Sequence, residues 1–171
     1  MAASHSGMKL SIEGQVDLLR PAVLSGFAAH MHLWLLGGAL IGFMAAWILW
    51  HPVPLMFALF FGLVGLSERH GGANIVAAIK AYDFDESTPG AASISVGTWD
   101  SSNTYHVTVR TSDHVDWVYE FIPQGWQPAD CVDVPAKIWQ DKASGAPLLA
   151  TVEGGIMIPR YPPGLPKQPF A

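Results

Sequence analysis

Charged side chains are scarce in this sequence and are missing from its longest apolar stretch. They make up 13% of the 171 residues, against about 25% in an ordinary soluble domain. No Asp, Glu, Lys or Arg occurs between Arg20 and Glu68. One helix over residues 21–67 would be roughly 70 Å long, more than twice the ~30 Å hydrocarbon core of a bilayer. We therefore expect a membrane segment that folds back on itself.

Cysteine and basic clusters are also lacking, and each absence excludes a class of protein. Cys131 is the only cysteine, so an intrachain disulfide and a cysteine-based zinc site are excluded. The formal net charge is −5 and no run of Lys or Arg occurs, which argues against a nucleic-acid partner. The apolar run is far longer than the ~7–15-residue core of a signal peptide. A retained anchor in a lipid bilayer is therefore expected.

Catalytic motifs are absent as well. The sequence has no P-loop, GxGxxG, HExxH or GxSxG pattern. Cys131 lies between Asp130 and Asp133, and carboxylates disfavour the thiolate that a nucleophile requires. His106 and His114 flank a turn, where they are either solvated or share a surface metal ion with a nearby Asp. We expect no enzyme activity.

The apolar run contains one obvious turn, at residues 51–54, where two prolines occur. It predicts a transmembrane hairpin over residues 21–70, with helices 21–50 and 53–70. Residues 1–20 precede it as an interfacial segment, which is either a short helix ending before Pro21 or an extended segment against a partner subunit. The second helix is short enough that a re-entrant segment is the alternative to a full span.

Basic residues predict the orientation of the hairpin. The basic residues nearest to the hairpin lie at its two ends: Lys9, Arg20, Arg69 and Lys80. The turn contains no basic residue. The positive-inside rule then places the N-terminus and the region after the hairpin in the cytoplasm. We expect a multi-pass protein of the inner (cytoplasmic) membrane. A re-entrant second helix would place the C-terminal domain on the opposite side.

Behind the hairpin, residues 71–158 predict a small antiparallel β-sandwich or barrel, so the fold class is membrane α + β. Apolar and polar residues alternate from about residue 73, and runs 93–99, 105–110 and 115–121 form a three-strand meander. Short strands are expected near 131–134, 137–139, 148–152 and 156–158. The last two flank a hairpin turn at residues 153–155. Six or seven strands result.

Three features of the chain predict contacts with partner proteins. Gly38 and Gly42 have the GxxxG spacing that lets another helix approach closely in lipid. Trp126, on a loop rich in Gly and Pro, is either an exposed anchor for a partner or the residue that closes one end of the β domain. The proline-rich tail, residues 159–171, is expected to be extended and to bind a partner through Pro162 and Pro163.

Three histidines lie at the edges of the apolar run. His30 and His32 begin the first helix and His70 ends the second. A fold-back at His51 places His32 and His70 at similar depth. Intramembrane imidazoles are candidates for function, so the pair predicts axial ligands of a haem, or one of them a ligand of a chlorin magnesium. The alternative is that all three lie at the interface, hydrogen-bonded to water or backbone.

The stretch Ala28-x-x-x-His32-x-x-x-Leu36 resembles the AxxxHxxxL pattern of purple-bacterial light-harvesting polypeptides. That resemblance implies a bacteriochlorophyll near His32. Those polypeptides have a single span and are much shorter, so this chain is not one of them.

A second run is similar to part of the barrel of the photosynthetic reaction-centre H subunit. It comprises residues 138–141, residues 148–153 and residues 156–159. The H subunit is also a membrane anchor followed by a cytoplasmic β domain, although it has one helix rather than two. Together the two resemblances imply an accessory subunit of a reaction-centre–antenna complex.

The leading hypothesis is a non-catalytic accessory subunit that stabilises a multisubunit, energy-transducing membrane complex. The resemblances make a photosynthetic reaction-centre–light-harvesting assembly the expected host, with its other membrane subunits as partners. Two alternatives stay open at this point. One is a haem-binding anchor subunit of a redox complex that uses His32 and His70. The other is a stand-alone membrane-anchored β domain that scaffolds other proteins.

Overall fold

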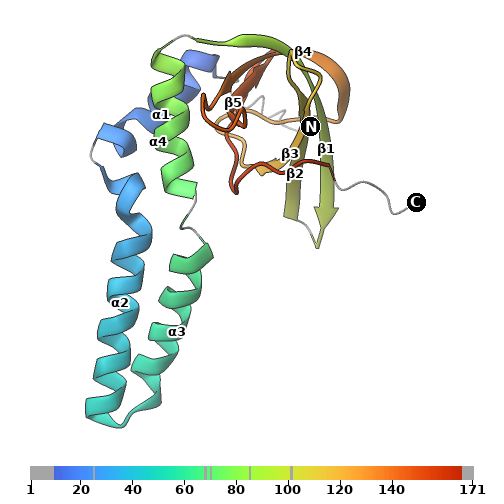
Figure 1. The fold of residues 1–171 in the computed structure, drawn as a ribbon. Coiled ribbons are helices and arrows are strands. Elements are labelled where there is room, and N and C mark those ends of the chain that lie inside the picture. The colour runs from blue at the N-terminus through green and yellow to red at the C-terminus, as the bar shows by residue number, and fades with distance from the viewer. Residues whose placement is uncertain are drawn as a thin grey trace, which may run out of the picture.

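The protein consists of a helical region followed by a curled antiparallel sheet (Figure 1). This computed structural model describes residues 10–24, 26–67, 69, 71–84, 86–100 and 102–166. The helices are α1 (Ile12–Leu24), α2 (Phe27–Leu49), α3 (Pro52–Ser67) and α4 (Gly71–Asp83). The strands are β1 (Thr88–Trp99), β2 (Ser102–Arg110), β3 (Asp116–Phe121), β4 (Cys131–Gln140), β5 (Pro147–Val152) and β6 (Gly155–Met157).

Helices α2 and α3 form the predicted hairpin and lie side by side (Figure 1). The chain reverses at Trp50, whose φ of 48° ends α2. Proline at the first position of α3 costs no hydrogen bond, because that N–H has no partner in a helix. The His51 Nδ1 accepts a hydrogen bond from the Val53 N–H at 3.3 Å. Two runs, His30–Leu49 and Pro52–Asp83, are long and apolar enough to cross a membrane by length and composition.

The break before α2 differs from the expected one. A helix boundary was predicted at Pro21, but α1 continues through this proline to Leu24. The chain bends instead at Gly26, which has a φ of 67° that glycine adopts without steric cost. The side chain of Val16 is buried between α1 and the β domain. This packing gives α1 a stabilising face that offsets the hydrogen bond lost at Pro21.

Residues 71–83 form helix α4, so the prediction that the β domain begins near residue 71 is wrong. Ile75, Ala78, Ile79 and Tyr82 are spaced as on one helix face and pack against the sheet. Figure 1 shows α4 beside α1, at the end of the hairpin away from the turn. The strands begin only at Thr88.

The six strands form one antiparallel sheet in the order β3-β2-β1-β4-β5-β6. The predicted meander of β1, β2 and β3 is confirmed, as is the hairpin between β5 and β6. The two short strands expected near residues 131 and 137 are a single strand, β4, which pairs with both β1 and β5. The twelve-residue β1 pairs with β2 over its whole second half, where it extends beyond β4.

The sheet curls until the chain that follows β6 reaches β3. Pro159 pairs with Phe121 and Gly164 pairs with Val118, both antiparallel. The Val118 N–H donates to the Gly164 carbonyl at 2.7 Å, and the Gly164 N–H donates back at 3.0 Å. Residues 159–164 of the proline-rich tail therefore lie along the edge strand of their own domain.

Two apolar cores result, on the two sides of the sheet. The inner core lies within the curled sheet and includes Val107, Val109, Phe121, Ile138 and Met157. The junction core lies between the outer face of the sheet and helices α1 and α4: Val16, Ala78, Ile79, Trp139, Leu149, Ile156 and Ile158. The junction core holds the β domain in one orientation relative to the helices.

Candidate functional site

One candidate site is an apolar groove along α2, on the side of the helix that faces away from α3. We call it the α2 groove. Its residues are spaced three and four apart and so share one helix face: Gly26, His30, Leu33, Trp34, Gly37, Gly38 and Ile41. A Cβ atom built on Gly37 or Gly38 would have nothing within 4 Å. This face is therefore open, and Trp34 beside it is 72% exposed.

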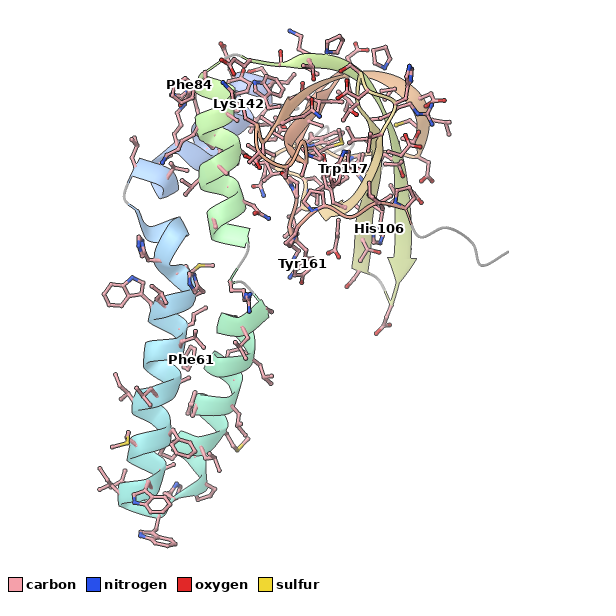
Figure 2. The ribbon with its side chains drawn as sticks, viewed as in Figure 1. Phe61, Phe84, His106, Trp117, Lys142 and Tyr161 are labelled. Atoms are coloured by element: carbon pink, nitrogen blue, oxygen red, sulfur yellow. The ribbon has the colours of Figure 1, made fainter. Side chains whose placement is uncertain are left out.

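The opposite face of α2 is closed by α3, and we call this contact the seam. A Cβ atom built on Gly65 would lie 3.1 Å from Leu35 Cβ and 3.3 Å from the His32 carbonyl oxygen. One built on Gly42 would lie 3.2 Å from Ala58 Cβ. Figure 2 shows Phe61 between the two helices. The helices approach so closely because glycine has no side chain at these points.

The seam changes the interpretation of the predicted GxxxG pair. Gly42 packs against α3 of the same chain, so the expectation that it contacts a partner helix is corrected. Gly38, one turn earlier, lines the open α2 groove. A partner contact stays a prediction for Gly38 alone.

The predicted histidine sites separate in the structure. His30 lies in the α2 groove, and its Nδ1 is 3.0 Å from the Gly26 carbonyl oxygen. His32 is half-buried at the level of Gly65 in the seam. His70, and with it the proposed His32–His70 pair, lies outside the described residues. Of the predicted site histidines that the structure describes, His30 has a ring contact that sets its tautomer.

The predicted partner contact at Trp126 is replaced by a role inside the β domain. Its ring stacks on Phe121 with centroids 6.1 Å apart, and its Nε1 donates to the Ile156 carbonyl at 3.2 Å. A Cβ atom on Gly155 would overlap the indole, so a glycine is required there. The second reading of the sequence, that Trp126 closes one end of the β domain, describes this geometry.

Replacing Trp126 should therefore destabilise the β domain. We expect Trp126→Ala to lower the free energy of unfolding by about 3 kcal/mol, because it removes a packed aromatic ring and one hydrogen bond. The exposed aromatic Phe84, which is 79% accessible, offers a control: Phe84→Ala should change stability by less than about 0.5 kcal/mol. Chemical denaturation in detergent, followed by tryptophan fluorescence or circular dichroism, measures both. Equal effects of the two variants would contradict this role.

The proline-rich tail is held by its own domain up to Gly164. Arg160 pairs with Glu120 of β3 at 3.1 Å, and the Asn74 side chain of α4 donates to the Pro159 carbonyl at 2.8 Å. This corrects the expectation that a partner holds residues 159–164 in place. Partner contacts at Pro162 and Pro163 stay predictions, and residues 167–171 lie outside the described chain.

Sequence reasoning missed the polar contact that joins α1 to the sheet. Gln15 is fully buried. Its Nε2 donates to the carbonyls of Leu10 at 2.9 Å and Gly154 at 3.0 Å, and its Oε1 accepts from the Ile156 N–H at 3.0 Å. A signal was present, because Gln15 lies on the same helix face as Ile12, Val16 and Leu19.

Charged groups of the described chain lie mostly in surface pairs. Arg20 of α1 contacts Asp83 of α4 at 2.7 Å and so joins the two helices. Asp116 and then Asp133 raise the pKa of the Arg110 guanidinium. Burial raises the pKa of the Tyr119 phenol, whose O–H donates to the Met157 carbonyl at 3.3 Å.

His106 and His114, which the sequence leaves either solvated or sharing a surface metal ion, do not belong to a group of three metal-binding side chains in the described part of the chain. Among those residues no three His, Cys, Asp or Glu side chains come together as a metal site would require. Figure 2 shows His106 at the surface of the β domain. No family of proteins, no characterised protein and no solved structure was found to match this chain.

Proposed function

We propose that this protein is a non-catalytic accessory subunit of a multisubunit membrane complex, which it contacts through the α2 groove. The observation that carries the proposal is the contrast between the two faces of α2. One face is closed by α3, while the other exposes two glycines beside Trp34. In a bilayer, helices associate through such close-packed small-residue surfaces rather than through the hydrophobic effect.

The β domain supports the same proposal from the membrane surface. The junction core and the Gln15 hydrogen bonds fix it to α1 and α4. It would therefore present one defined face to subunits that surround the hairpin. A rigidly oriented domain suits a stabilising role, because less ordering entropy is lost when a partner binds.

For the host complex, we propose a photosynthetic reaction-centre–light-harvesting assembly in a cytoplasmic membrane. The proposal draws on the two sequence resemblances. The run similar to the H subunit, residues 138–159, falls on β4, β5 and β6, which are consecutive and adjacent strands. The antenna-like pattern falls at the start of α2, next to the groove.

The test is recovery of the complex from the organism's own membrane. A tagged chain, solubilised in mild detergent, should co-purify with other membrane subunits that native mass analysis identifies. Trp34→Ala should weaken that association about 30-fold, since a buried tryptophan anchor contributes about 2 kcal/mol.

Trp47→Ala is the matched control, because Trp47 is also on α2 and almost equally exposed, 70% against 72% for Trp34. It lies outside the α2 groove and should leave recovery unchanged. A wild-type chain recovered alone, or equal recovery with the two variants, would contradict the proposal. Partners that carry no pigment would contradict the photosynthetic host while leaving the accessory role intact.

A further inference from the structure

The His30 ring has one fixed tautomer. Its Nδ1 lies 3.0 Å from the Gly26 carbonyl oxygen, four residues earlier. A carbonyl oxygen only accepts, so Nδ1 must carry the hydrogen of this bond. In the neutral imidazole, Nε2 then has an unprotonated lone pair. No residue that the structure describes donates a hydrogen bond to it.

This arrangement is the one by which proteins prepare a histidine to bind a metal. A ligating imidazole donates its second N–H to a carbonyl or carboxylate, which fixes both the tautomer and the ring orientation. Here the acceptor is the carbonyl of the glycine at which the chain turns into α2. Coordination through Nε2 would leave the hydrogen bond from Nδ1 to this carbonyl in place.

The remaining residues of the α2 groove exclude a bare metal ion. None of them is charged, and His30 is the only one with a side chain that ligates metals well. A protein-bound zinc ion usually has at least three protein ligands. A metal tetrapyrrole differs, because the macrocycle supplies four nitrogen ligands and a zinc or magnesium centre needs one axial ligand more.

The shape of the groove fits such a flat, apolar ring. Leu33, Trp34 and Gly37 follow His30 by three, four and seven residues, so they extend along the same face for about 10 Å. That length is comparable to the width of a tetrapyrrole. A Cβ atom at Gly37 or Gly38 would meet nothing within 4 Å, so the helix backbone is open to the face of a macrocycle.

We infer that the α2 groove holds a metal tetrapyrrole whose single axial protein ligand is the Nε2 of His30. The inference rests on the proposed function, and it replaces the direct glycine-mediated helix contact at the groove with a tetrapyrrole that lies between α2 and the partner subunit. It also moves the ligand from His32, the residue in the antenna-like pattern, to His30. His32 lies on the seam side of α2, where Gly65 of α3 approaches its backbone carbonyl and its side chain is half-buried.

The test uses the full-length protein in mild detergent and zinc protoporphyrin IX as the probe. Axial ligation by an imidazole shifts the main absorption band of a zinc porphyrin to longer wavelength. The wild-type chain should give this shift with one porphyrin bound per chain. His30→Ala should lose the shift, and His32→Ala should keep it.

Two further measurements distinguish metal ligation from non-specific hydrophobic binding of the porphyrin. Metal-free protoporphyrin IX should bind wild-type and His30→Ala chains equally, because it has no metal for the imidazole. Gly37→Leu should weaken zinc-porphyrin binding at least tenfold by filling the open face. No saturable shift in the wild-type chain, an undiminished shift in His30→Ala, or a shift lost in His32→Ala alone would overturn the inference.

Failure of this inference and failure of the proposed function are distinguishable. If the chain binds no zinc porphyrin but still co-purifies with membrane subunits in a Trp34-dependent way, only the tetrapyrrole inference is contradicted. If the chain binds zinc porphyrin at His30 but is recovered alone from its own membrane, the tetrapyrrole site is supported and the accessory role is contradicted.

Discussion

Gln15→Leu is expected to lower the free energy of unfolding by about 3–5 kcal/mol, the largest effect of any single polar substitution outside the hairpin. The variant would remove the Gln15 partner of three backbone groups: the part-buried carbonyls of Leu10 and Gly154 and the buried N–H of Ile156. Each unsatisfied buried group costs about 1–3 kcal/mol. Leucine has a volume similar to that of glutamine, so its packing adds little stability. It forms no hydrogen bond, so the loss of the three hydrogen bonds is not offset.

The experiment is chemical denaturation of the purified chain in detergent, together with hydrogen exchange at the Ile156 amide. That amide should exchange much faster in Gln15→Leu, because the side-chain acceptor is gone. Gln124→Leu is the matched control: its Nε2 makes one long, exposed bond of 3.4 Å to the Ile122 carbonyl. A similar loss of stability in both variants would show that Gln15 does not hold α1 on the sheet.

Gly65→Leu is expected to separate α2 from α3. The first atom of any side chain at this position would lie 3.1 to 3.3 Å from Leu35, Leu36 and the His32 carbonyl, closer than ordinary contacts. The remaining atoms of leucine have no space in the seam, so the helices must move apart or rotate. Gly38→Leu adds the same side chain on the open face and should leave the hairpin intact.

A cross-link across the seam measures the effect directly. A Cβ atom on Gly62 would lie 3.7 Å from Ala39 Cβ, within the range of a disulfide. In a Cys131→Ser background, the pair Ala39→Cys and Gly62→Cys should therefore oxidise readily. Adding Gly65→Leu should abolish the cross-link, and adding Gly38→Leu should not. Efficient cross-linking in the Gly65→Leu chain would contradict the close packing of α2 and α3 at Gly65.

The hairpin could be predicted from the sequence because two strong signals coincide there. Charge is excluded over residues 21–67, and two prolines interrupt the run near its middle. The face of α2 that meets α3 could not be predicted, since this helix is apolar on all sides and no polar stripe marks an exposed face. Gly38 and Gly42 therefore looked equivalent, although one lies in the groove and the other in the seam.

The β domain was predictable where alternation was strict and less so elsewhere. Buried residues alternate with more accessible ones over residues 105–110 of β2 and residues 118–121 of β3. Helix α4 was missed because its buried positions include small residues such as Ala78. Such residues contribute little to the hydrophobic periodicity by which an amphipathic helix is recognised. The position of Gln15 on the apolar face of α1 was visible in the sequence, but its partners on the sheet were not, since they lie 139 and 141 residues away.

The candidate site was predictable in part. The histidines at the start of α2 stood out in an uncharged run, but the choice between His30 and His32 depends on the Gly26 carbonyl and on the setting of α3. The position of the Gly26 carbonyl and the setting of α3 both depend on the bend at Gly26. The sequence analysis predicted this bend five residues earlier, at Pro21.

The paired edges of the sheet have a consequence for a protein at high local concentration. An open edge strand is a template on which a second copy can add a strand, and repeated addition leads to aggregation. Here Pro159 and Gly164 engage β3, and Gln15 takes the outward N–H of Ile156 on β6. Crowded neighbours can therefore meet this domain only through its side chains. The same proline-rich tail that closes the sheet would keep densely packed copies from polymerising.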